Sequence, residues 1–380
     1  METLKPTVLV TGVSGNLGRR LLEQLSGYAV VGIDLTPPAA PLDRFVALDL
    51  GREESTRQLH LLIRETRPVS VVHLAFVIDP QRTGVIDVDR MWQINVAGTA
   101  RVMEAITEAN RAAGLIVRQF IFPSSVSAYG SDLPQPVTED SPLEAHTLPY
   151  AVHKKESDLV VQQRAPSLRG CGVFILRPHI FAGATVENYL MGAFRGTPNG
   201  KGERATRMRQ EGRRLPIMMP YGQKYLDNKI QFIHVDDMAR LIAWLLKREP
   251  EPQRLTILNV AGRGEPLTFG QCIQEAQAKL VRVPGKWVMR LVLQFLWNRK
   301  ISAIPPAAVP YMTGQYIMDT SRLKTFLGTD YEGVITKTSF EAFLDSFPDL
   351  TARAFPNTAP PPPSYRESTK PDESPPASSA

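Results

Sequence analysis

A tyrosine and a lysine four residues apart offer the clearest chemistry in this sequence. Tyr150 and Lys154 stand at the head of a predicted helix that runs to about Arg164, and this spacing places both side chains on one helix face. A phenol with a pKa of about 10 is a poor base at neutral pH, and a nearby ammonium group stabilises the phenolate and lowers that pKa. The pair therefore suits the movement of a proton to and from an alcohol oxygen.

A serine-rich stretch lies before this pair, directly after a strand predicted over Arg118 to Ser124. It reads Ser124-Ser125-Val126-Ser127-Ala128-Tyr129-Gly130. A hydroxyl group beyond the end of a buried strand can hold a substrate oxygen while a phenol moves the proton. Serine, tyrosine and lysine in this order are what hydride transfer at an alcohol carbon requires, because the cofactor supplies only the hydride.

Three glycines near the N-terminus form the turn that a pyrophosphate requires. An apolar run over Val8 to Val10 precedes Gly12, and Gly15 and Gly18 lead into a helix predicted over Arg19 to Leu25. The first glycine allows a tight turn, the second lets the backbone approach the phosphates, and the third lets helix and strand pack closely. The free N–H groups at the start of the helix then face the anion.

A carboxylate ends the next predicted strand, which runs from Tyr28 to Asp34, about 20 residues past the glycine turn. An acid at this place accepts both hydroxyls of the adenosine ribose and repels a 2′-phosphate. Asp34 therefore predicts NAD rather than NADP as the cofactor. An aspartate that only caps a loop is the alternative interpretation.

Strands and helices alternate along the first half of the chain. Further strands are predicted over Arg44 to Leu50 and Val69 to Ala75, and helices over Glu53 to Thr66 and Val88 to Arg111. This alternation predicts an α/β fold with a Rossmann-type, doubly wound parallel sheet that binds its ligand at the carboxyl ends of the strands.

The expected organisation is an NAD-binding domain, a smaller C-terminal substrate-binding region and a disordered tail rich in proline and serine. Their bounds are 1–177 for the NAD-binding domain, completed by about 230–262; 178–229 and 263–350 for the substrate-binding region; and 355–380 for the tail.

Composition narrows the function class. The chain has 380 residues, of which 43% are hydrophobic, and only two cysteines, Cys171 and Cys272, without neighbours at metal-ligand spacing. No disulfide framework or metal site is expected, and a cytoplasmic location fits. No run of about 20 uncharged apolar residues predicts a membrane span. The net charge of +6 is that of an ordinary solvated surface, so we expect a small-molecule substrate and no nucleic acid.

An ordered set of short motifs covers the chain from about Thr7 to Leu246. The motifs are T-G-V-S-G-N-L-G from Thr11, Asp34, Asp49-Leu50, His73-Leu74-Ala75, Asn95-Val96-Ala97-Gly98-Thr99, Ser124-Ser125 before Tyr129-Gly130, Tyr150 with Lys154, Leu176-Arg177-Pro178, and Phe232-Ile233-His234-Val235-Asp236-Asp237. In these motifs the chain resembles the extended short-chain dehydrogenase/reductase family, the NAD-dependent epimerase/dehydratase group.

The resemblance implies roles for individual residues. Tyr150 would be the acid/base, Lys154 would lower its pKa and hold the nicotinamide ribose, and Ser125 would orient the reacting oxygen. Ser125 is preferred to Ser124 because it stands four residues before Tyr129, as the catalytic serine of the family does. The residues implied in NAD binding are Gly12, Gly15, Asn16, Leu17, Gly18, Asp34, Asp49, Leu50, Leu74, Ala75, Asn95, Lys154 and Pro178. A homodimer is a common outcome in the family.

Departures from the family pattern concern the substrate. Val126 and Ser127 replace the acidic pair of the dehydratase branch, so 4,6-dehydration is not expected. Ile230-Gln231 stands where many nucleotide-sugar enzymes carry Arg-Asp, with Lys229 as a substitute cation. Ile180 replaces an asparagine of the 4-epimerase branch. Asn188 is a weaker candidate for contact with a nucleotide.

These signals predict an NAD-dependent epimerase or dehydrogenase that acts at a secondary alcohol or its ketone. The substrate is a nucleotide sugar or a more apolar, sterol-like or polyketide-like alcohol, and Ile180 and Ile230 favour the latter. A non-catalytic NAD-binding regulator is the hypothesis from another class. It predicts a broken triad, whereas Ser125, Tyr150 and Lys154 are all present.

Three segments of the second half have two interpretations each. Arg195 to Arg214 holds seven Lys or Arg and is expected as a solvated, partly disordered insertion rather than a substrate lid. Trp287 to Trp297 is expected as a helix packed over the substrate cleft, with a peripheral membrane contact as the alternative. His234 is expected to be structural, with Asp236 and Asp237 as caps of the following helix.

Overall fold

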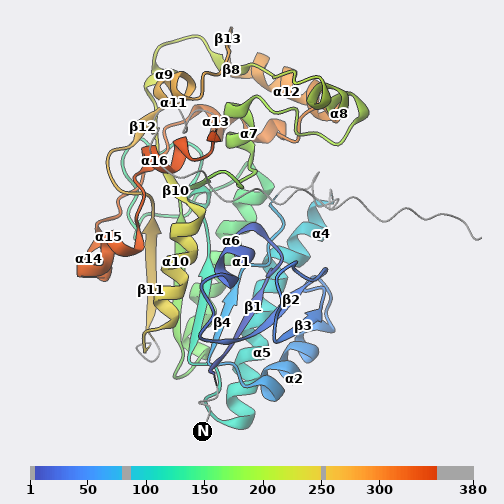
Figure 1. Ribbon diagram of the computed structural model, residues 1–380, viewed down its shortest axis with the longest axis vertical. Coiled ribbons are helices and arrows are strands. Elements are labelled where there is room, and N and C mark those ends of the chain that lie inside the picture. The colour runs from blue at the N-terminus through green and yellow to red at the C-terminus, as the bar shows by residue number, and fades with distance from the viewer. Residues whose placement is uncertain (1–4, 79–86, 250–253, 349–380) are drawn as a thin grey trace, which may run out of the picture.

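A seven-stranded parallel sheet forms the centre of the computed structural model, which describes residues 5–78, 87–249 and 254–348 (Figure 1). The strands lie in the order β11, β6, β5, β4, β1, β2, β3. Their bounds are β1 Thr7–Thr11, β2 Ala29–Asp34, β3 Arg44–Ala47, β4 Ser70–His73, β5 Gln119–Pro123, β6 Gly172–Pro178 and β11 Leu255–Val260. The chain order reverses beside β1, and such a reversal opens a ligand crevice at the carboxyl ends of the strands. The predicted doubly wound α/β fold is confirmed.

Helices cover both faces of this sheet (Figure 1). One face carries α2 (Ser55–Thr66), α5 (Gly98–Ala113) and α6 (Pro149–Arg164), and the other carries α1 (Asn16–Leu22) and α10 (Val235–Leu246). Successive strand residues point to opposite faces, so Leu9 packs under α2 and α5 while Val8 and Val10 pack under α1 and α10. Burial on both faces explains the continuous apolar runs of the strands.

The long helix predicted over Val88 to Arg111 is divided into three parts. It consists of α4 (Val88–Trp92), a π-helical turn (Gln93–Ala97) and α5. The Asn95 carbonyl oxygen accepts hydrogen bonds from the hydroxyls of Thr99, at 2.6 Å, and Ser157, at 3.0 Å. The wider turn therefore exchanges part of the regular helical ladder for side-chain donors, and such turns are frequent at functional sites.

A second group of elements lies beyond the carboxyl edge of the sheet. Its short strands pair as β10 with β7, β12 with β9 and β13 with β8. The strands are β7 Ile180–Ala182, β8 Ile217–Pro220, β9 Lys229–Ile230, β10 Phe232–His234, β12 Leu267–Thr268 and β13 Leu280–Val283. The helices are α7 Tyr189–Arg195, α8 Glu203–Gln210, α9 Lys224–Asp227, α11 Phe269–Glu275, α12 Lys286–Asn298, α13 Val309–Thr313 and α16 Ser339–Leu344. Two further helices, α14 Ser321–Leu327 and α15 Tyr331–Val334, pack instead beside α10 and β11 of the sheet (Figure 1).

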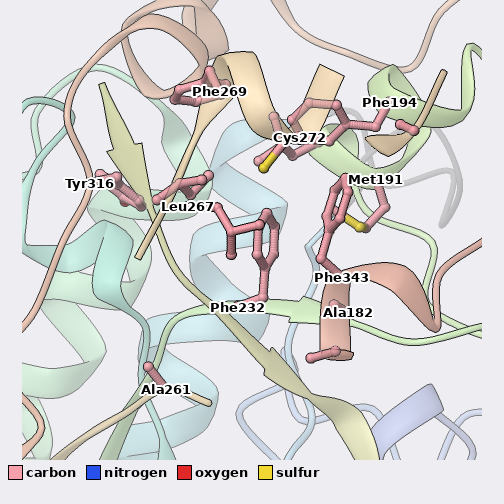
Figure 2. Packing of buried hydrophobic residues seen from close by; sticks show 14 of the residues in the cluster. Ala182, Met191, Phe194, Phe232, Ala261, Leu267, Phe269, Cys272, Tyr316 and Phe343 are labelled. Atoms are coloured by element: carbon pink, nitrogen blue, oxygen red, sulfur yellow. The ribbon is translucent and has the colours of Figure 1, made fainter. Parts of the chain in front are cut away.

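Aromatic side chains fill the core of this second group (Figure 2). The Phe343 ring lies 5.0 Å from that of Phe232 and 5.3 Å from that of Phe194, centroid to centroid. This core joins the one beneath α1 and α10, because Leu17 and Phe181 pack against both. The turn before α1 is therefore fixed from both sides.

The basic segment from 195 to 214 is ordered, contrary to expectation. It contains α8, and the Arg209 guanidinium donates a hydrogen bond of 2.9 Å to the Gly200 carbonyl oxygen. The backbone N–H groups of Gly200 and Gly202 donate to the carbonyl oxygens of Ile301 and Lys300. These bonds fix α8 beside the end of α12. The prediction failed because the residues that hold the segment are about 100 positions away.

His234 itself caps α10, where the aspartates were expected to do so. Its Nδ1 accepts a hydrogen bond of 3.2 Å from the N–H of Asp236. Asp237 is buried and accepts instead from the N–H of Lys337, at 2.9 Å. The structural role predicted for His234 is thus found, with the cap assigned to a different residue.

Helix α12 is packed on one face only. Met289 and Leu293 are buried in a cluster with Leu148 and Met312, which agrees with the expected helix above the cleft. Within the described residues, no helix is long and apolar enough to cross a membrane. The predicted tail, 355–380, lies outside the described residues.

Candidate active site

A cavity of about 310 Å³ lies where the two groups of elements meet, at the carboxyl ends of the central strands. The glycine turn, the serine-rich stretch, Tyr150 and Lys154 all contribute to its wall. The lining includes Gly12, Gly15, Asn16, Leu17, Gly18, Leu74, Ser125, Tyr150, Lys154, Pro178 and Asn188. Most of the predicted site residues thus meet at one place.

The glycine turn has no room for side chains. Gly12 has φ +70°, and a Cβ there would lie 2.5 Å from the backbone nitrogen of Ala75. A Cβ on Gly18 would lie 2.5 Å from the Gly12 carbonyl oxygen, whereas the nearest atom to one on Gly15 is 3.2 Å away. The outer glycines therefore serve the fold, and Gly15, which lines the cavity, keeps the approach to the helix N-terminus open.

Two polar atoms of the wall fit a bound NAD. Asn16 Oδ1 and Ser124 Oγ are buried without a hydrogen-bond partner among the described residues, and both residues line the cavity. Buried polar atoms are normally paired, so these two mark positions where a ligand completes the bonding. Together with the glycine cradle they fit a dinucleotide.

Asp34 and Asp49 lie near the turn but outside the cavity lining. Asp34 accepts hydrogen bonds from the N–H groups of Ser14, at 3.0 Å, and Leu35, at 2.7 Å. Asp49 accepts from the N–H of Gly51 at 2.9 Å and pairs with the Arg90 guanidinium. The carboxylate of Asp34 is thus directed at the glycine turn, where the adenosine ribose was predicted.

Tyr150 is hydrogen-bonded to the hydroxyls of Ser125 and Ser127. Ser125 Oγ accepts from both the O–H, at 2.8 Å, and the N–H, at 3.1 Å, of Ser127. Because two donors already point at this oxygen, the Ser125 proton is available for the phenol or a substrate oxygen. Burial raises the pKa of Tyr150, and the two serine hydroxyls oppose that shift.

Lys154 is buried and its ammonium group lies over an aromatic ring. Its Nζ donates a hydrogen bond of 2.7 Å to the Pro123 carbonyl oxygen and lies 3.6 Å from the centre of the Phe76 ring. The same ring meets that of Tyr150 edge-on, at 5.9 Å. Burial lowers the pKa of Lys154 to about 7, and the nearby Asp158 opposes this shift.

A buried histidine orders the backbone next to the turn. Thr11 Oγ1 lies 2.7 Å from His73 Nδ1, and His73 Nε2 lies 3.0 Å from Thr99 Oγ1. Thr99 donates to the Asn95 carbonyl oxygen, so the ring must donate from Nε2 and accept at Nδ1. Burial lowers the pKa of His73 to about 3, which keeps the ring neutral. Thr11 then accepts from the Ala75 N–H at 3.2 Å.

Several residues predicted to bind the cofactor lie outside the lining of the cavity. Asn95 is fully buried, and its amide group pairs with the N–H and carbonyl of Val77, at 2.7 and 3.0 Å. Leu50 is buried in the core beneath α2 and α5. Asp34, Asp49, Leu50, Ala75 and Asn95 are the five that do not line the cavity. Asn95 therefore positions the chain after β4 from beneath.

Three aromatic side chains and a histidine complete the site without having been predicted. Phe76 follows H-L-A directly in sequence, while Tyr311 and Tyr316 come from the last part of the chain. Burial raises the pKa of Tyr311 to about 12, and burial also raises the pKa of Tyr316 well above its usual range. His179 Nε2 lies 3.0 Å from the Tyr316 carbonyl oxygen. Phe76 and His179 each directly follow one of the sequence motifs described above, and that adjacency could have identified them, whereas no motif stands next to Tyr311 or Tyr316.

The substrate side of the cavity is mostly apolar. Lys154 and Glu187 are the charged residues in its described lining, and Lys229 is exposed elsewhere. Asn188 lines the cavity, but its oxygen caps α7 and its amide donates to the Phe181 carbonyl oxygen at 2.8 Å. Among the described residues, no group of three His, Cys, Asp or Glu could hold a metal ion.

Sequence comparison identifies relatives among epimerases. UDP-glucose 4-epimerases of Dictyostelium discoideum and Drosophila melanogaster are each 26% identical to the chain, covering 63% and 62% of it and 71% and 70% of those proteins. A 72-residue match, 42% identical, covers 19% of this chain but only 18% of the UDP-glucose 4-epimerase of Erwinia amylovora.

Solved structures share the fold. The UDP-glucose 4-epimerase of Thermus thermophilus, in complex with NAD, has a TM-score of 0.62 at 19% identity, covering 93% of this chain and all of that one. A putative epimerase from Burkholderia cenocepacia has a TM-score of 0.63 at 17% identity, covering 92% of this chain and 99% of that one.

A family match joins these observations. Residues 8–261 match the family described as the NAD dependent epimerase/dehydratase family. This span contains the glycine turn, the serine-rich stretch, Tyr150 and Lys154. The chain therefore belongs to the NAD-dependent epimerase/dehydratase family and is an NAD-dependent enzyme of the extended short-chain dehydrogenase/reductase type.

Proposed function

We propose that this enzyme interconverts a secondary alcohol and its ketone, as an epimerase or a dehydrogenase, with Tyr150 as the acid/base. One observation carries the proposal: the Tyr150 hydroxyl is bonded to Ser125 and Ser127 within the cavity that the glycine turn also lines. Gly12, Gly15, Asn16, Leu17, Gly18, Asp34, Leu74, Lys154 and Pro178 would hold the dinucleotide.

The residues divide the work of moving one proton. Ser125 donates its free O–H to the substrate oxygen, and Tyr150 takes or returns the proton of that oxygen. Bound NAD supplies the acceptor for the hydride of the substrate carbon and, in an epimerase, its source on the return. Lys154 is the cation nearest to these groups in the lining and would favour the phenolate once a ligand draws it from the Pro123 carbonyl.

Two substrate classes remain, each with its own support. The UDP-glucose 4-epimerase relatives favour a nucleotide sugar. The cavity wall favours an uncharged, more apolar alcohol, since Ile180, Phe181 and Met312 line it and Lys154 is the cation in its described lining. A diphosphate without a nearby Arg or Lys would be costly to bind. The cytoplasmic location and the homodimer stay part of this proposal.

Tyr150→Phe tests the catalytic role. The variant keeps the ring packed against Phe76 and removes only the hydroxyl. We expect kcat for the alcohol–ketone conversion to fall about 10²- to 10⁴-fold, the usual contribution of a general acid/base. Turnover would be followed as NADH absorbance for a dehydrogenase and as product stereochemistry for an epimerase.

The control is the NAD content of the two proteins, measured by absorbance and mass after denaturation. Equal NAD content with lost turnover supports the proposal. Unchanged turnover, or an unchanged biological effect of the variant in cells, would instead support a non-catalytic NAD-binding regulator.

A further inference from the structure

Helix α12 carries an apolar stripe on its outer face. Trp287, Leu291 and Phe295 follow one another at intervals of four residues and are 66%, 60% and 51% exposed. The opposite face, with Met289 and Leu293, is buried. The sequence left two interpretations of this segment open, a packed helix and a helix with a surface contact. The helix has a buried face that suits the first and an exposed apolar face that suits the second. An exposed stripe of large apolar residues marks an interaction surface.

Basic residues flank this stripe, and no acidic residue stands among them. Between positions 286 and 300 the chain holds Lys286, Arg290, Arg299 and Lys300, all exposed, and no Asp or Glu. The Arg299 guanidinium lies 5.0 Å from the centre of the Phe295 ring, so charge and apolar surface meet directly.

Helix α8 extends the positive surface. The bonds of Gly200 and Gly202 to residues 300 and 301 hold its start against the end of α12. Arg204 and Arg207 are exposed along it. In Figure 1 both helices lie at the end of the molecule away from the central sheet.

We propose that the α12 stripe and its basic surroundings dock the enzyme on an anionic phospholipid bilayer. An amphipathic helix with aromatic and aliphatic residues on one side and Lys or Arg beside them lies in the headgroup layer. Anionic lipids attract Lys and Arg side chains near the bilayer surface, which provides the charge complementarity. Cations outnumber acids on this surface, because Glu203 and Glu211 are the acids of α8 and its C-terminal end, while residues 286–300 hold four cations and no acid.

Docking would place the cavity close to the bilayer. The buried face of α12 packs on Leu148, Ala308 and Met312, and all three line the active-site cavity. One layer of side chains therefore separates the docking helix from the site. The surface itself is independent of the proposed catalytic roles.

Vesicle flotation of the purified full chain tests the proposal. Vesicles with about 30 mol% phosphatidylglycerol in phosphatidylcholine should bind the protein, phosphatidylcholine alone should bind at least about tenfold less, and salt near 1 M should release it. A variant with Trp287→Ser, Leu291→Ser and Phe295→Ser should lose binding by about tenfold or more.

Leu61→Ser is the matched control, because Leu61 is 55% exposed on α2, at the other end of the molecule (Figure 1). It should float as the unchanged protein does. NAD binding and the thermal unfolding of the triple variant confirm that it is folded. Absence of flotation, or equal flotation of the triple variant, overturns the proposal. So does a dimer that the triple variant converts to a monomer, since a second copy would then occupy the stripe.

Discussion

The Phe76 side chain contacts both Lys154 and Tyr150. Its ring lies over Lys154 Nζ and meets the Tyr150 ring at its edge. Burial lowers the pKa of Lys154 from 10.5 to about 7, so folding releases a proton between these values. Because the folded pKa is the lower one, this group makes the free energy of unfolding rise with pH through that window and fall as pH drops toward 7.

Because protonated Lys154 favours the phenolate, we expect loss of its proton to set the basic limb of the pH profile of kcat/KM. Phe76→Ala is expected to move this limb to higher pH, by up to about one pH unit. Loss of the ring admits water to Lys154 and weakens the burial that lowers its pKa. Phe76→Leu, which keeps an apolar cover, should leave the limb in place. A downward shift in the alanine variant would mean that attraction between ring and cation exceeds the effect of burial.

At the scale of residues, local sequence was enough to predict Ser125, Tyr150 and Lys154. Tyr150 and Lys154 lie on one helix, and Ser125 follows closely after one strand. It could not predict that Lys154 faces Phe76, since that contact depends on how α6 packs against the chain after β4. The same holds for His73, whose partners Thr11 and Thr99 come from two other elements.

At the scale of elements, the seven residues of the glycine turn include two glycines that the fold requires and one that we expect to matter for ligand binding. The outer glycines meet backbone atoms at distances that no Cβ tolerates, while Gly15 has more room. Its dihedral angles, φ −67° and ψ 169°, are open to alanine. The three positions can therefore be tested against one another.

Gly18→Ala is expected to lower the free energy of unfolding by about 1–3 kcal/mol, as overpacking does. Gly15→Ala should change stability by less than about 1 kcal/mol but weaken NAD binding by about tenfold or more, because its methyl group lies where a pyrophosphate approaches. Urea titration and calorimetric NAD binding measure the two effects. Undiminished NAD affinity in Gly15→Ala would place the pyrophosphate elsewhere.

The elements that sequence reasoning located well are those with strong local patterns, such as the buried strands and α6. It missed the π-helical turn within Val88 to Arg111. The hydrogen bonds that favour this turn come from the hydroxyls of Thr99 and Ser157, and the hydrophobic pattern of the sequence does not reveal them. It also missed α8, whose sequence is strongly polar apart from Ala205 and Met208 and whose support comes from residues 300 and 301.

Across the whole molecule, the two groups of elements are joined at the cofactor turn. Asn16 Nδ2 donates a hydrogen bond of 2.8 Å to the Thr185 carbonyl oxygen, and the Arg20 guanidinium donates one of 3.3 Å to the Thr185 hydroxyl. The cores share Leu17 and Phe181. The division at 177 predicted from the sequence stays a proposal, and these contacts argue that any such units depend on each other.

We therefore expect one cooperative thermal transition, shifted as a whole by NAD. A ligand that binds only the folded chain at 100 times its Kd adds about 2.7 kcal/mol, which for a protein of this size raises Tm by about 3 to 5 °C. Calorimetry and far-UV circular dichroism should agree with each other on the midpoint, both for the free protein and for the NAD complex, while NAD raises that midpoint. NADP should shift it less, because Asp34, the residue proposed to bind the adenosine ribose, would repel a 2′-phosphate. Two transitions, of which NAD moves only one, would show that the glycine turn and the second group of elements unfold separately.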